Sequence, residues 1–121
     1  MTVLGPVVNV FYFVADLPRA TEWYTARLGL EPAVVRSQLV MYEVAGMRLT
    51  VHVVDEFNRA GPSGPVAYWD VEDVDRVVAE WSEHGAVAHR GPKTIFTGER
   101  LCQVLDPFGN LIGLRQASGA T

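Results

Sequence analysis

The sequence predicts an α+β fold built from two similar βαβββ modules, each a strand, a helix and three further strands. Two stretches carry this prediction, FYFVADLPRATEWYTARLGL and YWDVEDVDRVVAEWSEHGAV. A third observation is that VMYEVAGMRLTVHV in the first half mirrors CQVLDPFGNLIGLR in the second, as two β-hairpins would. Neither module could cover its own sheet alone, so the two are expected to pack around a shared concave surface.

The elements of the two modules follow in the same order. Each module opens with an apolar strand that ends in valine, and an aspartate then stands where a helix N-cap is expected. Apolar residues recur at helical spacing after the aspartate, and a glycine marks the expected end of each helix. The matching positions are Val14, Asp16 and Gly29 in the first module and Val71, Asp73 and Gly85 in the second.

The chain of 121 residues is expected to form a single domain, 1–121. The first module is expected over about 5–54 and the second over about 66–116. Between them the stretch DEFNRAGPSGP, rich in glycine, proline and polar residues, is the expected linker, about 55–65.

Composition excludes several classes of function. The net charge of −4 argues against a nucleic-acid binder, which would carry a basic patch. It favours a cationic ligand slightly, although mild acidity also serves solubility. Cys102 is the only cysteine, which excludes an internal disulfide and a cysteine-based zinc site. The apolar stretch 1–14 has no Lys or Arg ahead of it and is too short to span a bilayer, so we expect a cytoplasmic protein without membrane partners.

The motifs resemble those of the vicinal oxygen chelate superfamily, which includes glyoxalase I, extradiol dioxygenases, fosfomycin-resistance enzymes and bleomycin-resistance proteins. VADLPRATEWYTARLGL is similar to the family pattern V-x-D-L…F-Y…L-G-L, and LDPFGNLIGL contains its D-P-x-G-N turn. VEDVD, near the start of the second module, is a further part of the resemblance. The resemblance runs from about Val7 to Gln116. It implies two βαβββ modules forming an open barrel or cup, commonly as a homodimer.

The family resemblance also implies a place for a divalent metal inside the cup. The four positions that carry ligands in metal-binding members fall on Asn9, Thr50, Val66 and Gly113 of this chain. A catalytic metal needs about three ligands from His, Asp, Glu or Cys, and these four residues offer only an amide and a hydroxyl. We therefore expect no metal and no other cofactor.

Strand alternation then sorts residues by face, with the ligand positions taken as inward. The inward set includes Phe13, Val40, Arg48, Asp70, Leu101 and Leu105, and Val10, Tyr12 and Val14 are expected under a helix. A cup of this kind suits an organic ligand with aromatic character. Gly113 would make room for the ligand or, alternatively, accommodate Tyr68 or Phe11 in a filled core. The expected ligand-binding residues are Asn9, Phe11, Tyr42, Thr50, His52, Tyr68, Gln103, Gly113 and Arg115.

The leading hypothesis is a metal-free protein that binds a small molecule, as bleomycin-resistance proteins sequester a drug. One alternative is a metal-independent enzyme with His52 as acid or base and with Asn9, Thr50 or Gln103 as positioning groups. A second is a glyoxalase- or dioxygenase-type metalloenzyme with other ligands, and a third is a filled cup that acts through its surface. The segment GPKTIFTG, residues 91–98, is a candidate lid.

Overall fold

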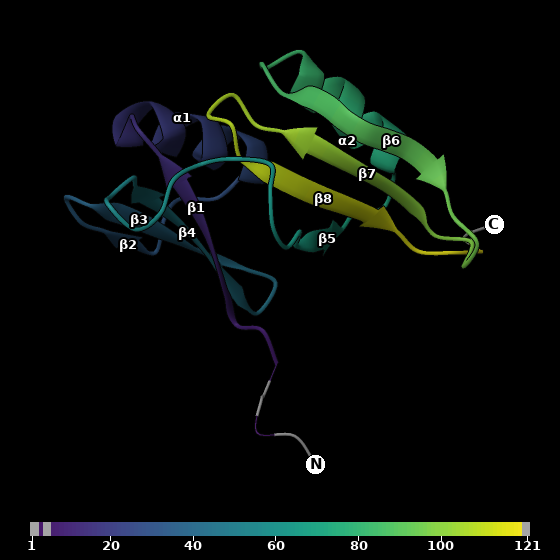
Figure 1. Ribbon diagram of the computed structural model, residues 1–121, viewed down its shortest axis with the longest axis horizontal. Helices are drawn as coiled ribbons and strands as arrows, with labels where there is room; N and C mark the ends of the chain where they lie inside the picture. Colours follow the sequence, from purple (N-terminus) through teal and green to yellow (C-terminus); the bar gives the residue numbers. More distant parts are fainter. Residues whose placement is uncertain (1–2, 4–5, 120–121) are drawn as a thin grey trace. The chain divides into compact units, whose positions relative to one another are not determined.

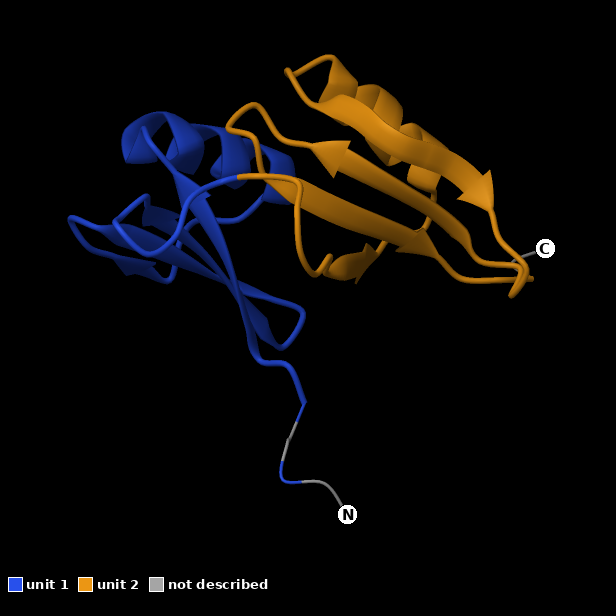
Figure 2. Cartoon of the chain, in the orientation of Figure 1, with its two compact units in different colours: residues 1–60 blue, residues 61–121 orange. Residues whose placement is uncertain are grey.

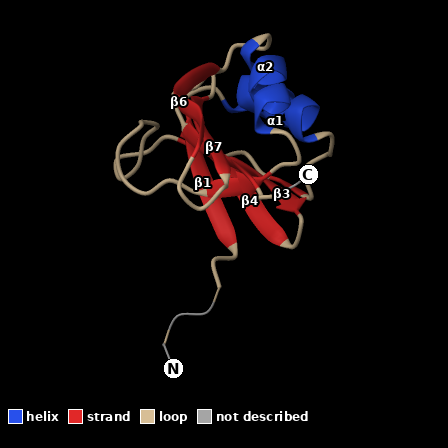
Figure 3. Ribbon diagram, turned by 90° about the vertical axis from the view of Figure 1, so that its right-hand side faces the viewer, coloured by secondary structure: helices blue, strands red, loops and turns tan. Residues whose placement is uncertain are grey.

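The computed structural model describes residues 3 and 6–119 and divides the chain into two compact units, Met1–Ala60 and Gly61–Thr121 (Figure 2). Each unit has one open four-stranded sheet and one helix, so the predicted α+β class and the βαβββ order are confirmed (Figure 3). The division lies inside the segment 55–65 that the sequence marks as a linker. Residue 5, the expected start of the first module, lies outside the described residues.

In the first unit, the first and the last strand along the chain are neighbours in the sheet. Its strand order is β1-β4-β3-β2, in which β1 runs parallel to β4 and the other pairs are antiparallel (Figure 1). The elements are β1 (Asn9–Val14), α1 (Leu17–Leu28), β2 (Val34–Val35), β3 (Leu39–Val44) and β4 (Met47–Val53).

The second unit repeats this topology. Its order is β5-β8-β7-β6, again with the first strand of the unit parallel to the last, and α2 packs on β6, β7 and β8 (Figure 1). The elements are β5 (Tyr68–Asp70), α2 (Val74–Ser82), β6 (Val87–Thr94), β7 (Arg100–Leu105) and β8 (Leu111–Gln116). No helix in the described part of the chain has the length and apolar character needed to cross a membrane.

Both helices begin as predicted. The Asp16 carboxylate accepts a hydrogen bond from the Arg19 amide at 3.1 Å, and Asp73 does the same for Arg76 at 3.1 Å. The first helix ends at Gly29, whose φ of 72° is the left-handed conformation that glycine adopts readily. The second helix ends earlier than predicted, at Ser82, and Gly85 follows in the next turn with φ 96°.

The helix-facing side of the first sheet forms the core of that unit. Tyr12 and Val14 are buried there, as predicted, and the Tyr12 ring stacks on Tyr24 of α1 with 6.0 Å between centroids. The same side carries Tyr42, which is 0% exposed. Its hydroxyl donates to the Thr21 carbonyl at 3.1 Å and lies 2.9 Å from the Thr25 hydroxyl, both on α1. Burial raises the pKa of Tyr42, so the phenol stays protonated.

The predicted orientation of β3 is therefore wrong. Val40 and Tyr42 were expected on the inward face with Thr50, but the strand register pairs Tyr42 with Leu49 and Met41 with Thr50. The segment LVMYEV is apolar on both of its faces, so alternation alone does not identify the buried one. Tyr42 holds the sheet to α1 and is not available to a ligand on the opposite face.

The second unit buries the equivalent side of its sheet. Cys102, Val104, Ile112 and Leu114 are all buried there. Burial raises the pKa of the Cys102 thiol, which favours the unreactive protonated form, as expected for a structural cysteine. At the end of β8, the side-chain oxygen of Gln116 accepts the Val74 amide at 2.9 Å and so caps α2 together with Asp73.

Arg100 of β7 ties the second sheet to α2 through Asp75. Its guanidinium contacts the carboxylate through two nitrogens, at 2.6 and 2.9 Å. The hydrogen bond from Arg100 lowers the pKa of Asp75. A lowered folded-state pKa adds stability above the unfolded-state pKa, and this contribution is lost as the pH falls through the folded-state value.

We predict that Asp75→Asn destabilises the protein at pH 7 and that the difference from wild type shrinks below about pH 4, where an aspartate becomes protonated in the unfolded chain. Urea denaturation at pH 7 and pH 3 measures this. Glu72→Gln is the matched control, since Glu72 is an exposed carboxylate just before the same helix and makes no ion pair within the described residues. An equal difference for Asp75→Asn at both pH values would contradict the assignment.

Candidate functional site

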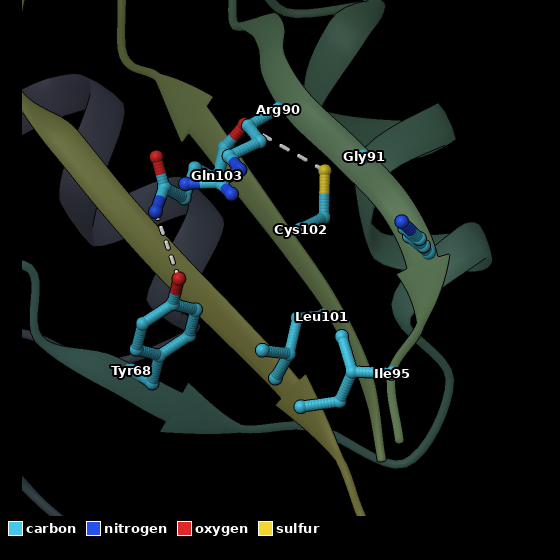
Figure 4. A pocket seen from close by; sticks show the side chains of 8 residues that line it. Tyr68, Arg90, Gly91, Ile95, Leu101, Cys102 and Gln103 are labelled. Atoms are coloured by element: carbon cyan, nitrogen blue, oxygen red, sulfur yellow. Dashed lines mark hydrogen bonds between the residues drawn. The ribbon is translucent and has the colours of Figure 1, made fainter. Parts of the chain in front are cut away.

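The second unit has a pocket on the sheet face that is turned away from α2 (Figure 4). It has a volume of about 250 Å³. Strand alternation explains its lining, because Arg90 lies opposite Gln103, Lys93 opposite Leu101, and Tyr68 beside Gly113. Cys102, whose side chain is buried on the helix-facing side, belongs to the lining as the residue between Leu101 and Gln103, and the full set is Tyr68, Arg90, Gly91, Lys93, Ile95, Leu101, Cys102 and Gln103.

Tyr68 and Gln103 are joined across the face of the sheet. The Gln103 amide nitrogen donates to the Tyr68 hydroxyl oxygen at 2.8 Å, as Figure 4 shows. Because the hydroxyl oxygen accepts this bond, its own hydrogen is free to donate to a bound molecule. The Tyr68 side chain is 41% exposed, which leaves much of the ring open to contact. Both residues were predicted to bind ligand, and both line the pocket.

Gly113 is a glycine because the Tyr68 ring lies against it. A Cβ at this position would stand 2.6 Å from the Tyr68 Cδ1 atom and 2.7 Å from the Ala67 carbonyl oxygen. Real Cβ atoms do not approach so closely. In this structure the Tyr68 ring takes the space beside Gly113, as in the alternative that this glycine accommodates Tyr68, although the ring lies on an exposed face and not in a filled core.

Arg115, also predicted to bind ligand, lies beside Gly113 but is engaged by two carboxylates. Its guanidinium pairs with Asp70 at 2.7 Å and with Glu99. A hydrogen bond from the Thr97 hydroxyl and the Arg115 guanidinium lower the pKa of Glu99, which keeps that carboxylate charged. The positive charge of Arg115 is thus balanced within the second unit.

The first unit brings together the other predicted residues on the sheet face opposite α1. The Thr50 hydroxyl donates to the Asn9 side-chain oxygen at 2.9 Å. Phe11 packs beside His52, with 6.1 Å between ring centroids, and keeps 46% of its area exposed. Thr50 is 0% exposed, so it can position Asn9 but cannot itself contact a ligand.

The His52 ring is held in one tautomer. Its Nδ1 atom lies 2.6 Å from the Val53 carbonyl oxygen, and because a carbonyl only accepts, Nδ1 carries the hydrogen. In the neutral ring the lone pair is then on Nε2, which is the nitrogen able to take up a proton. Phe13 also packs against the His52 ring, at 5.6 Å between centroids.

The four positions that the family resemblance identifies with metal ligands do not fit a divalent metal. In the first unit the oxygen of Asn9 already accepts from Thr50, which leaves a neutral amide and a hydroxyl. In the second unit Val66 has no donor atom, and the place beside Gly113 is filled by the Tyr68 ring. Among the residues that the structure describes, no group of three or more His, Cys, Asp or Glu could hold a metal ion.

Sequence reasoning missed the cationic side of the pocket. Arg90 was not singled out, and Lys93 and Ile95 were placed in a candidate lid at 91–98. That prediction is wrong for 91–94, which belong to β6, because Gly91 and Pro92 interrupt the strand pattern without ending the strand. The β6–β7 pairing has two register shifts, and the one between Arg90 and Lys93 accommodates this pair. These shifts break the alternation of β6, so strand alternation alone would not have placed both Arg90 and Lys93 on the Gln103 face, and only the pairing with β7 does so.

The sequence matches the family model of the Glyoxalase/Bleomycin resistance protein/Dioxygenase superfamily over residues 6–114. The chain belongs to this superfamily. The family resemblance of the sequence motifs is thus confirmed, over nearly the whole length on which it was proposed.

Several solved structures share the fold. A glyoxalase/bleomycin resistance protein from Catenulispora acidiphila is 25% identical, with a TM-score of 0.68, and the match covers 93% of this chain and 99% of that one. A protein from Agrobacterium tumefaciens reaches a TM-score of 0.80 at 21% identity over 96% and 100% of the two chains. A glyoxalase-related enzyme from Fulvimarina pelagi has a TM-score of 0.78 at 17% identity, and the match covers 94% of this chain and 89% of that one. No curated protein matches the sequence.

Proposed function

We propose that this member of the superfamily binds a small organic molecule without a metal, in the pocket of its second unit. The pocket combines an exposed aromatic ring, apolar side chains and a few hydrogen-bonding groups, which is the usual composition of a small-molecule site. Tyr68 supplies a face for stacking, and Ile95 and Leu101 supply apolar contact.

The observation that carries this proposal is the arrangement around Gly113. The family resemblance implies a carboxylate ligand at this position in metal-binding members. In this chain an aromatic ring covers the position, and Gln103 holds that ring by its hydroxyl group. The carboxylate that would serve a metal is absent, and the ring that covers its position lines the pocket, which favours binding of an organic ligand directly by the protein.

Metal-independent binding predicts that chelation leaves the site intact. We expect the purified full chain to contain no stoichiometric transition metal by elemental analysis. We also expect it to bind the fluorescent probe anilinonaphthalenesulfonate with the same affinity before and after dialysis against EDTA. About one transition metal for each chain, together with loss of probe binding in EDTA, would contradict the proposal.

A second candidate function is a metal-independent enzyme that uses His52 as its base. The hydrogen bond from Nδ1 to Val53 favours it, since it leaves Nε2 ready to accept a proton. The two functions are distinguished by incubating the protein with any compound that copurifies with it and then measuring the mass of that compound. Recovery of the unchanged compound supports binding alone. Conversion that persists in EDTA and disappears in His52→Ala establishes the enzyme.

We further propose that the protein retains its ligand unchanged, as a resistance protein does when it sequesters an aromatic drug or metabolite. We place it in the cytoplasm as a homodimer. The family resemblance supports the dimer, and sedimentation equilibrium of the full chain measures it directly. A monomer at micromolar concentration would contradict the dimer without affecting the pocket.

A further inference from the structure

The charge at the pocket is positive, although the chain as a whole is negative. Arg48, Arg100 and Arg115 each lie on a strand and each pair with a carboxylate. Arg90 and Lys93 are the other two strand cations, and neither pairs with a carboxylate within the described residues. Arg90 and Lys93 are therefore the two strand cations without a carboxylate partner within the described residues, and both line the pocket.

The hydrogen-bonding groups of the pocket are mostly donors. Arg90 and Lys93 carry only donors on their charged groups. The Tyr68 hydroxyl accepts from Gln103, so its own hydrogen is available to donate to an acceptor on a ligand. The Gln103 side-chain oxygen is the exception. In Figure 4 the Arg90 side chain lies beside Gln103, on the opposite side of that residue from the Tyr68 ring.

Apolar side chains complete the other part of the pocket. Ile95 and Leu101 lie side by side in Figure 4, near the Tyr68 ring and away from Arg90. The volume of about 250 Å³ lies just below the usual range of about 300–1,000 Å³ for small-molecule sites, so it suits a small ring system. A ligand that fits both parts has an apolar ring at one end and acceptor oxygens at the other.

We propose that the pocket selects an organic anion, with its carboxylate, sulfonate or phosphate group held by Arg90 and Lys93 and its ring held against Tyr68 and Leu101. This inference rests on the proposed function and gives it a ligand class. An anionic ligand is the opposite of what the net charge of the chain favours, since a net charge of −4 by itself slightly favours a cationic ligand. The local arrangement of unpaired cations outweighs the net charge, because interactions between exposed charges are screened over about 8 Å at physiological ionic strength.

Two probes with the same ring system test the inference. Anilinonaphthalenesulfonate carries a sulfonate, and phenylnaphthylamine is the same skeleton without it. We expect the anionic probe to bind the full chain about tenfold more tightly, the size of one charge-assisted hydrogen bond. Arg90→Gln and Lys93→Gln should each weaken the anionic probe severalfold and leave the neutral probe unchanged. Added sodium chloride should weaken the anionic probe alone.

Arg76→Gln is the matched control for these variants. It removes the same charge from an exposed position on α2, which packs on the other face of the sheet, and it should change neither titration. Equal affinity for both probes in wild type and in the two pocket variants overturns the anion inference and leaves the proposed function standing. Failure of both probes to bind wild type overturns the proposed function itself. Circular dichroism and thermal melting of each variant show that the fold is retained.

Discussion

Replacing Tyr42 with alanine should lower the free energy of unfolding by about 3–5 kcal/mol, as truncation of other large buried aromatic side chains does. The side chain is 0% exposed, and its removal leaves a cavity between β3 and α1. It also leaves the Thr25 hydroxyl without the Tyr42 oxygen beside it. Urea denaturation followed by circular dichroism measures the change.

Tyr68→Ala is the control for this prediction, because it truncates the same residue type on an exposed sheet face. We expect it to cost clearly less stability than Tyr42→Ala, since 41% of Tyr68 is already exposed, and to abolish binding of anilinonaphthalenesulfonate. Tyr42→Phe should cost only about 1 kcal/mol, the usual value of one hydrogen bond, and should leave probe binding intact. Loss of probe binding in Tyr42→Phe would show that the Tyr42 side chain serves the ligand after all.

Gly113→Ala should destabilise the protein by about 1–3 kcal/mol, the range seen when a methyl group is forced into a packed site. The added Cβ would meet the Tyr68 ring at 2.6 Å and the Ala67 carbonyl at 2.7 Å. The ring can move, but the carbonyl belongs to the backbone beside β5 and its amide partner is Gly113 itself, at 2.9 Å. Urea denaturation measures the loss, and displacement of Tyr68 should weaken probe binding at the same time.

Gly61→Ala is the matched control, because a Cβ at Gly61 meets nothing within 4 Å and no positive φ is required there. It should change stability by no more than about 0.5 kcal/mol, as surface substitutions do. The double variant Gly113→Ala with Tyr68→Ala should recover part of the loss, since it removes the close contact with the ring and leaves that with the Ala67 carbonyl. A Gly113→Ala protein as stable as wild type would contradict the account of this glycine.

The parts of the fold that the sequence predicts well are set by local chemistry. Asp16 and Asp73 cap their helices because a short carboxylate satisfies exposed amides at a helix start, and Gly29 ends α1 because it adopts a left-handed conformation. These signals occur twice in the same order, so the amino-acid sequence alone predicts the two-module organisation. Tyr68 could be placed on its face by alternation from Val66, a position that the family resemblance identifies with a metal ligand and takes as inward.

The parts that could not be predicted depend on contacts between strands. The segment around Tyr42 is apolar on both faces, so its orientation is decided by the hydrogen bonds to Thr21 and Thr25 on α1. Lys93 follows a Gly-Pro pair that interrupts the pattern of β6, and only the pairing with β7 shows that it faces the pocket. Gly113 is likewise explained by a contact with Tyr68, which lies 45 positions earlier in the chain.

Metal-independent binding at the pocket is the central claim, and amide NMR of the labelled full chain in EDTA tests it most directly. Titration with anilinonaphthalenesulfonate should shift the amide signals of β6, β7 and Tyr68 most strongly, and added zinc should not change the result. Shifts that appear only after zinc is added, or that leave Tyr68, Arg90 and Gln103 unmoved, would contradict the claim.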